Sequence, residues 1–144
     1  MKSAQVLALS SSRVGDGAYL EKAVAVVKDF LGEKKHRIGF VPFASVDSYE
    51  LYAEKVSEAF TSLPYTIQMI DHSNAKEIIE ASDVIMVGGG NTFKLLHDLY
   101  AADIVSLIKE KVESGTPYIG WSAGSNLTGP TICTTNDMPI IEPK

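Results

Sequence analysis

The stretch DVIMVGGGN, residues 83–91, decides how the rest of the chain is expected to fold. Its apolar run is continuous, which is typical of a strand that is buried on both faces of a sheet. Three glycines end the run, and the next segment, TFKLLHDLY (residues 92–100), has the spacing of a helix. A strand that enters a glycine turn and then a helix is the repeating unit of a parallel α/β sheet.

The same alternation of strand and helix runs along the whole chain. The predicted strands are residues 4–10, 37–43, 65–71, 83–91 and 117–121. The predicted helices are residues 16–32, 48–63, 74–82, 92–100 and 103–115, with a further helix beginning at 123. We expect the strands at residues 4–10 and 37–43 to be buried. The pattern therefore predicts an α/β fold, a three-layer parallel sheet with helices on both faces, in one domain over residues 1–144.

Composition and charge indicate which kinds of partner the protein is expected to bind. The chain has 144 residues, of which 45% are hydrophobic and 22% charged, as in ordinary globular proteins. The net charge is −5 and the basic residues are scattered, so nucleic acid is not an expected partner. Neither a signal pattern nor an apolar run of membrane-spanning length is visible, and we expect a cytoplasmic protein with no membrane partner. No CxxC or histidine-rich tract indicates a metal site.

A serine flanked by glycines follows the last predicted strand, in YIGWSAGSN, residues 118–126. The segment GWSAG fits the pattern G-x-S-x-G, in which a nucleophilic serine lies on a sharp turn between a strand and a helix. Small neighbours are needed there because the backbone is strained and crowded. Ser122 is therefore a candidate nucleophile, with the N–H of Ala123 as a candidate oxyanion donor. An ordinary turn between a strand and a helix fits the same five residues.

The glycine turn at residues 88–91 is a second candidate element. Its glycines let backbone N–H groups approach a ligand, which suits one half of an oxyanion hole or a phosphate site. The dinucleotide fingerprint fails, because Phe93 holds the position of its last glycine, and no P-loop lysine follows. Asn91 as the N-cap of the next helix is compatible with the oxyanion role.

A serine nucleophile also needs a base to accept its proton. His36 precedes a predicted strand and so lies at the wrong edge of the sheet. His72 follows a strand at the correct edge, and His97 lies inside a predicted helix. The sequence places none of these three histidines beside Ser122.

Two further candidate residues, Asp137 and Cys133, lie later in the chain than Ser122. Asp137, in TTNDMP (residues 134–139), either orients a group of the site or forms an Asx turn before a proline. Cys133 is the single cysteine, so no internal disulfide is possible. We expect it to be a thiol of the core.

Four motifs in the same order give the chain a resemblance to a known family. They are FVPFA (residues 40–44), IMVGGGNTFKLL (85–96), YIGWSAGSNL (118–127) and PTICTTNDMPII (130–141). Together they resemble peptidase E, an aspartyl dipeptidase family of serine peptidases that is related in fold to the class I glutamine amidotransferases. The resemblance spans nearly the whole chain. An amidotransferase of that class would carry cysteine where this chain carries Ser122.

The resemblance implies a serine-type dipeptidase that hydrolyses peptides with an N-terminal aspartate, chiefly Asp-Xaa dipeptides. The reaction would pass through an acyl-enzyme on Ser122, with neither metal nor cofactor. The family's glycine-rich oxyanion loop falls on residues 88–91 of this chain. By resemblance, the site residues are the nucleophile Ser122, the oxyanion donors Gly89, Gly90 and Ala123, and the supporting residues Asn91, Asn136 and Asp137.

The chain departs from the family after the segment NDMPIIEP, residues 136–143. In family members the catalytic histidine and its acidic partner lie downstream of that segment. We therefore expect a shortened, C-terminally incomplete domain that is inactive because it lacks the catalytic base. A fragment or split protein, a shortened gene product, and a base from a partner chain are the three explanations. A shortened sheet exposes an edge strand and apolar surface, so we also expect self-association.

Two other functions fit the same residues. One is a non-catalytic binding or oligomerisation module that keeps the fold and lacks turnover. The other is a cyanophycinase-like enzyme that cleaves β-aspartyl bonds, which an assay of α- and β-aspartyl dipeptides side by side would distinguish. A true α/β-hydrolase fits less well, because it leaves the other motifs unexplained.

Overall fold

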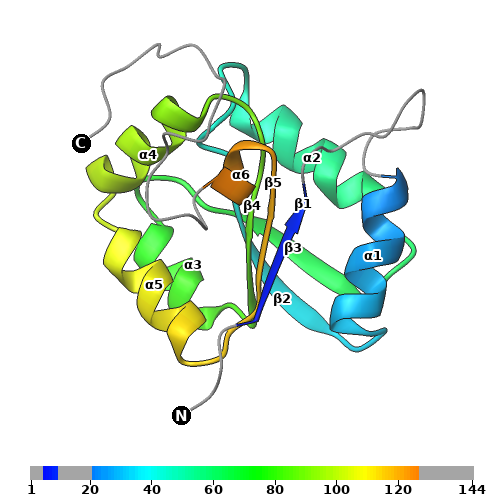
Figure 1. Ribbon diagram of the computed structural model, residues 1–144. Coiled ribbons are helices and arrows are strands. Elements are labelled where there is room, and N and C mark those ends of the chain that lie inside the picture. The colour runs from blue at the N-terminus through cyan, green and yellow to red at the C-terminus, as the bar shows by residue number, and fades with distance from the viewer. Residues whose placement is uncertain (1–4, 10–20, 127–144) are drawn as a thin grey trace.

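A computed structural model describes residues 5–9 and 21–126, and it shows a five-stranded sheet with helices on both faces (Figure 1). The strands are β1 (Val6–Leu9), β2 (His36–Val41), β3 (Tyr65–Met69), β4 (Val84–Val87) and β5 (Tyr118–Trp121). The helices are α1 (Glu21–Leu31), α2 (Tyr49–Ala59), α3 (Ala75–Ala81), α4 (Thr92–Ala101), α5 (Val105–Glu113) and α6 (Ala123–Asn126). The order is β1-β5-β4-β2-β3 and every pairing is parallel, which confirms the predicted three-layer α/β fold.

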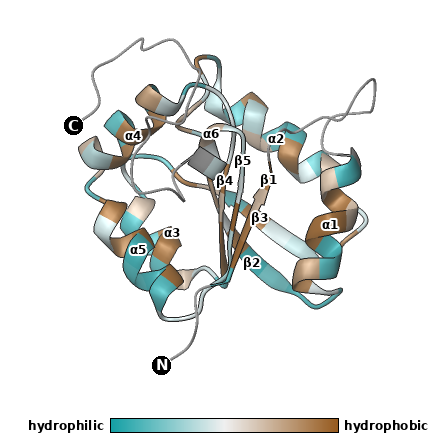
Figure 2. Cartoon of the chain, in the orientation of Figure 1, coloured by the Kyte–Doolittle hydropathy of each residue, from teal (hydrophilic) through white to brown (hydrophobic). Residues whose placement is uncertain are grey.

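The central strand β4 is buried at every residue, because helices cover both of its faces. Val84 and Met86 lie in the core under α1 and α2. Ile85 and Val87 lie in a second core under α3, α4 and α5. Figure 2 shows the hydrophobic colour along the central strands and a mixture of both colours on the covering helices. The continuous apolar run thus results from burial on two sides rather than one.

The first strand differs from the expectation that it is buried. β1 lies at one edge of the described sheet, and its residues alternate between exposed and half-buried. Val6 is 44% exposed, whereas Leu7 and Leu9 pack against the core under α1 and α2. The prediction of a buried strand is therefore wrong for the face that carries Val6. An apolar run predicts a strand but not its place in the sheet, and at an edge one face has less cover.

The carboxyl ends of the parallel strands bring several loops to one edge of the sheet. Chain segments that follow β1, β2, β4 and β5 all begin there, since parallel strands share one direction. Backbone hydrogen bonds join these segments: Gly88 N to Val41 O (3.1 Å), Asn91 N to Ala44 O (2.8 Å) and Ser122 N to Leu9 O (2.9 Å). The two candidate elements from the sequence, the glycine loop and the serine turn, are both held in this network.

Phe40 is the residue whose truncation should test this core most sharply. Its side chain is fully buried, and its ring stacks on Trp121 at 5.9 Å and meets Tyr52 edge-on at 5.2 Å between centroids. We predict that Phe40→Ala lowers the free energy of unfolding by about 3–5 kcal/mol, measured by urea denaturation. Val46→Ala, at a side chain that is 67% exposed, should change it by less than about 0.5 kcal/mol. Equal losses in the two variants would contradict the assigned core.

Candidate active site

Ser122 occupies a strained turn between β5 and α6. Its φ is 54°, in the left-handed region that few residues other than glycine adopt. Its N–H donates to the carbonyl of Leu9 at 2.9 Å, and its own carbonyl accepts from the N–H of Ser125 at 3.0 Å. The hydroxyl oxygen of Ser125 lies 2.5 Å from Leu9 O and 2.8 Å from Gly120 O, so its one proton is within hydrogen-bond distance of both carbonyls. These bonds hold the strained backbone between β1 and the first turn of α6.

The two glycines around Ser122 are required by close backbone contacts. A Cβ on Gly120 would lie 2.6 Å from the carbonyl oxygen of Gly124. A Cβ on Gly124 would lie 2.1 Å from the carbonyl oxygen of Val87, at the end of β4. The Gly124 carbonyl also accepts the buried hydroxyl of Tyr118 at 2.7 Å, and burial raises the pKa of that tyrosine. The G-x-S-x-G pattern is thus explained by how tightly the turn packs on the sheet.

The glycine loop lies directly against the Ser122 turn. A Cβ on Gly89 would lie 3.0 Å from the Cβ of Ser122 and 3.2 Å from the carbonyl oxygen of Trp121. Gly90 has a φ of 140°, and a Cβ there would lie 2.2 Å from the carbonyl oxygen of Ala44. Two segments that are more than thirty residues apart in sequence therefore meet through glycines that leave no room for side chains.

The N–H of Gly89 already has an acceptor within the protein. It donates to the hydroxyl of Tyr52 at 2.8 Å, and the indole N–H of Trp121 donates to the same hydroxyl at 3.0 Å. An N–H carries one proton, so this bond competes with the oxyanion role that the resemblance implies for Gly89. The oxyanion roles of Gly90 and Ala123 stay predictions. Ala123 is the first residue of α6 and is fully buried, and the first N–H groups of a helix lack intrahelical acceptors.

Asn91 forms the N-cap of α4. Its side chain accepts from the N–H of Lys94 at 3.1 Å, and its own N–H donates to Ala44 O at 2.8 Å. The interpretation of Asn91 as an N-cap is confirmed. Its supporting role in the site stays a prediction, and the cap explains how the glycine loop is anchored to the helix that follows it.

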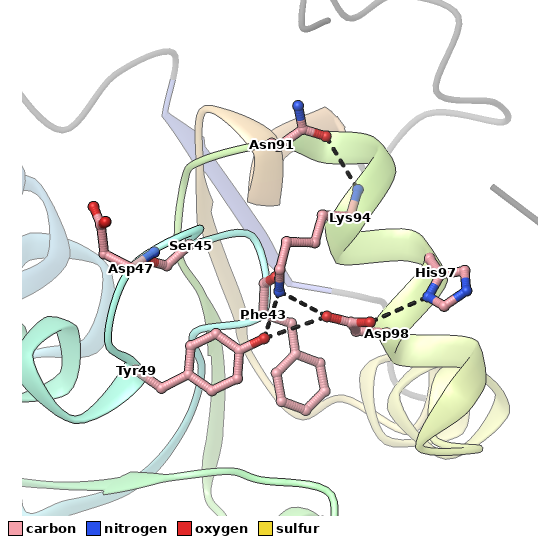
Figure 3. A network of polar contacts seen from close by, with 8 residues as sticks. All are labelled: Phe43, Ser45, Asp47, Tyr49, Asn91, Lys94, His97 and Asp98. Carbon is pink, nitrogen blue, oxygen red and sulfur yellow. Dashed lines mark hydrogen bonds and ion pairs between the residues drawn. The ribbon is translucent and has the colours of Figure 1, made fainter. Parts of the chain in front are cut away.

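A half-buried polar cluster, which the sequence did not predict, ties α4 to the loop after β2 (Figure 3). The ammonium of Lys94 donates to the carbonyl of Phe43 at 2.8 Å, the hydroxyl of Tyr49 at 2.5 Å and the carboxylate of Asp98 at 2.7 Å. The ring of His97 meets the second oxygen of that carboxylate at 3.1 Å. The only signal in the sequence is the spacing of Lys94 and Asp98, four residues apart on one helix.

Hydrogen bonds within this cluster outweigh the effect of burial on the charges of Lys94 and Asp98. Burial is the largest effect on Lys94 and disfavours its charge, but hydrogen bonds to Asp98 and Tyr49 raise its pKa overall. Burial likewise opposes the ionised form of Asp98, yet hydrogen bonds from Lys94 and His97 leave its pKa below the ordinary value. The cluster therefore keeps an ion pair beside the loop that follows β2.

Each of the three histidines contacts a residue other than Ser122. Nε2 of His36 lies 3.1 Å from the carbonyl of Leu31, at the amino end of β2. The ring of His72 stacks on Phe43 at 4.9 Å between centroids. His97 is bound to Asp98, as described above. No hydrogen bond between a histidine and Ser122 is recorded in the described part of the chain.

Several candidates lie outside the described residues. These are Asn136, Asp137 and Cys133. Within residues 5–9 and 21–126, no three His, Cys, Asp or Glu side chains gather in a group that could hold a metal ion. None of the described helices has the length and apolar character needed to cross a membrane.

Comparison with known proteins identifies the family to which the chain belongs. The sequence profile of peptidase family S51 matches residues 6–144. The chain is 47% identical to a peptidase E from Shewanella amazonensis over 141 residues, which is 96% of this chain and 60% of the relative. It is 50% identical to a peptidase E from Shewanella sp. strain ANA-3 over 139 residues, covering 95% and 58% of the two chains.

A solved structure agrees with the sequence comparison. A Listeria monocytogenes EGD-e protein that carries the peptidase E name superposes with a TM-score of 0.75 at 28% identity. The superposition covers 90% of this chain and 64% of that one. The chain belongs to peptidase family S51, and it spans about three fifths of the length of the curated relatives it matches.

The ion pair in the α4 cluster predicts a pH-dependent contribution to stability. Because the pKa of Asp98 is lowered on folding, its contribution is fully present above the ordinary pKa of 3.8 and is lost as pH falls through the lowered pKa. We predict that Asp98→Asn lowers the free energy of unfolding by about 2 kcal/mol at neutral pH. The difference between wild type and variant should shrink as the solution is acidified below pH 3.8.

Asp103→Asn is the matched control for that measurement. Asp103 is 91% exposed and lies 3.7 Å from Lys76, and its φ of 56° is one that asparagine tolerates. Its replacement should change stability by less than about 0.5 kcal/mol. Equal effects of the two substitutions in urea titrations, or a difference that does not depend on pH, would contradict the role given to Asp98.

Proposed function

We propose that this chain carries the nucleophile of a serine peptidase that hydrolyses peptides with an N-terminal aspartate, chiefly Asp-Xaa dipeptides. The observation that carries the proposal is the strained φ of 54° at Ser122, a non-glycine residue packed against a glycine loop at the carboxyl edge of a parallel sheet. Such a turn is a nucleophile elbow, which projects a serine hydroxyl away from the sheet. Membership of family S51 and similarity to proteins named peptidase E support a peptidase function. The aspartyl substrate class rests on the resemblance of the four sequence motifs.

The proposed reaction begins with attack of the Ser122 hydroxyl oxygen on the carbonyl carbon of the aspartyl residue. The new C–O bond converts the carbonyl oxygen to an oxyanion, and the hydroxyl proton passes to a base. The backbone N–H groups of Gly90 and Ala123 would stabilise the oxyanion. As the tetrahedral intermediate collapses, the protonated base donates its proton to the departing nitrogen, the peptide bond breaks, and the second residue leaves as a free amine. Water then hydrolyses the aspartyl ester on Ser122.

Hydrolysis of Asp-Leu provides the test of this function. In a form of the protein that also supplies the base, we predict that Ser122→Ala lowers kcat/KM by at least about 10³-fold relative to wild type, because the covalent route is lost. Ser114→Ala, at an exposed residue that ends α5, should leave the rate unchanged. The peptidase E of Shewanella amazonensis serves as the reference for the assay.

Two outcomes separate this function from the alternatives. Measurable hydrolysis at equal rates by wild type and Ser122→Ala would contradict the nucleophile assignment. Faster hydrolysis of β-Asp-Leu than of α-Asp-Leu would favour the cyanophycinase-like alternative over the aspartyl dipeptidase.

A further inference from the structure

We propose that Tyr52 of α2 is a positioning residue that fixes the glycine loop, residues 88–91, against the Ser122 turn. For its catalytic consequence the proposal rests on the proposed function, whereas its structural part is independent of that function. Tyr52 comes from a helix that supplies none of the candidate site residues. Its hydroxyl nevertheless contacts both halves of the site.

One oxygen atom accepts hydrogen bonds from two separate segments. The N–H of Gly89, in the loop after β4, donates to the Tyr52 hydroxyl at 2.8 Å. The indole N–H of Trp121, the residue before Ser122, donates to it at 3.0 Å. A displacement of either segment relative to the other must lengthen one of these bonds. The hydroxyl therefore fixes the spacing between the glycine loop and the strand that carries the nucleophile.

The surroundings of Tyr52 leave its ring little freedom. The ring meets Phe40 edge-on at 5.2 Å, and Phe40 in turn stacks on Trp121 at 5.9 Å between centroids. Gly88 admits the hydroxyl only because it has no side chain, since a Cβ there would lie 2.6 Å from the Tyr52 oxygen. The first glycine of the loop is thus required for the approach of Tyr52, which is a reason distinct from oxyanion binding.

The hydrogen bond to Tyr52 also implies a different role for each glycine of the loop. Because the Gly89 proton is directed to the Tyr52 hydroxyl, Gly89 anchors the loop. The loop's oxyanion donor is then the N–H of Gly90, whose φ of 140° is open to glycine alone. Gly88 provides space, Gly89 provides the anchor, and Gly90 provides the donor.

Nuclear magnetic resonance of the 144-residue chain tests the structural part directly. Trp121 is the only tryptophan, so its indole N–H gives a single resonance. In Tyr52→Phe we expect the indole N–H and the Gly89 amide to exchange with solvent about tenfold faster than in wild type. The amide resonances of Gly90 and Ala123 should shift as well, because the loop loses its anchor.

Tyr65→Phe is the matched control. It removes one tyrosine hydroxyl that donates to Gly32 O, a contact that involves neither candidate element of the site. This variant should leave the four reporter resonances in place. Unchanged Gly90 and Ala123 resonances in Tyr52→Phe, or equal shifts in both variants, would overturn the proposal. Gly88→Ala, which pushes on the same oxygen, should reproduce the Tyr52→Phe shifts, and a different pattern would count against it.

Steady-state hydrolysis of Asp-Leu distinguishes a positioning role from a general loss of stability. In the form of the protein that also supplies the base, we expect Tyr52→Phe to lower kcat by about 10- to 100-fold with KM within about twofold, because the loop is misplaced only with respect to the transition state. A rise in KM at constant kcat would overturn the catalytic role. Should Ser122→Ala show that the proposed function is wrong, the resonance shifts still decide whether Tyr52 couples the two segments.

Discussion

The contact on which the site depends is the approach of α6 to the end of β4. The backbone of Gly124 lies so close to the carbonyl oxygen of Val87 that a Cβ would be 2.1 Å from it. This contact sets how far the first turn of α6 can stand from the sheet. Ser122 joins β5 to the helix at that distance with a left-handed φ of 54°. The strain at Ser122 thus follows from the packing of the sheet.

Hydrogen bonds and rings on both sides of the sheet keep the strained turn and the glycine loop in place. On one side, Tyr52 holds Gly89 and Trp121 through a single hydroxyl. On the other, the N-cap of Asn91 and the three hydrogen bonds of Lys94 tie the start of α4 to the loop after β2. Preorganisation of this kind suits a reaction that develops charge on an oxygen beside backbone N–H groups.

Most of the fold could be predicted from the sequence, because continuous apolar runs and glycine turns are local signals. The exposure of Val6 could not be predicted, since it depends on which strand lies at the edge of the sheet. The meeting of the glycine loop with Ser122 followed from parallel topology and family resemblance together. Tyr52 and Lys94 were missed because their contacts join residues 37 and 51 positions away, and no periodic pattern marks such pairs.

The central claim is that the strained residue, Ser122, is a nucleophile. Its most direct measurement is the intact mass of the chain after brief incubation with the p-nitrophenyl ester of aspartate, whose leaving group needs no protonation. We predict the addition of one aspartyl group, located on Ser122 by peptide mapping and absent from Ser122→Ala. No added mass, or the same addition in Ser122→Ala, would contradict the claim.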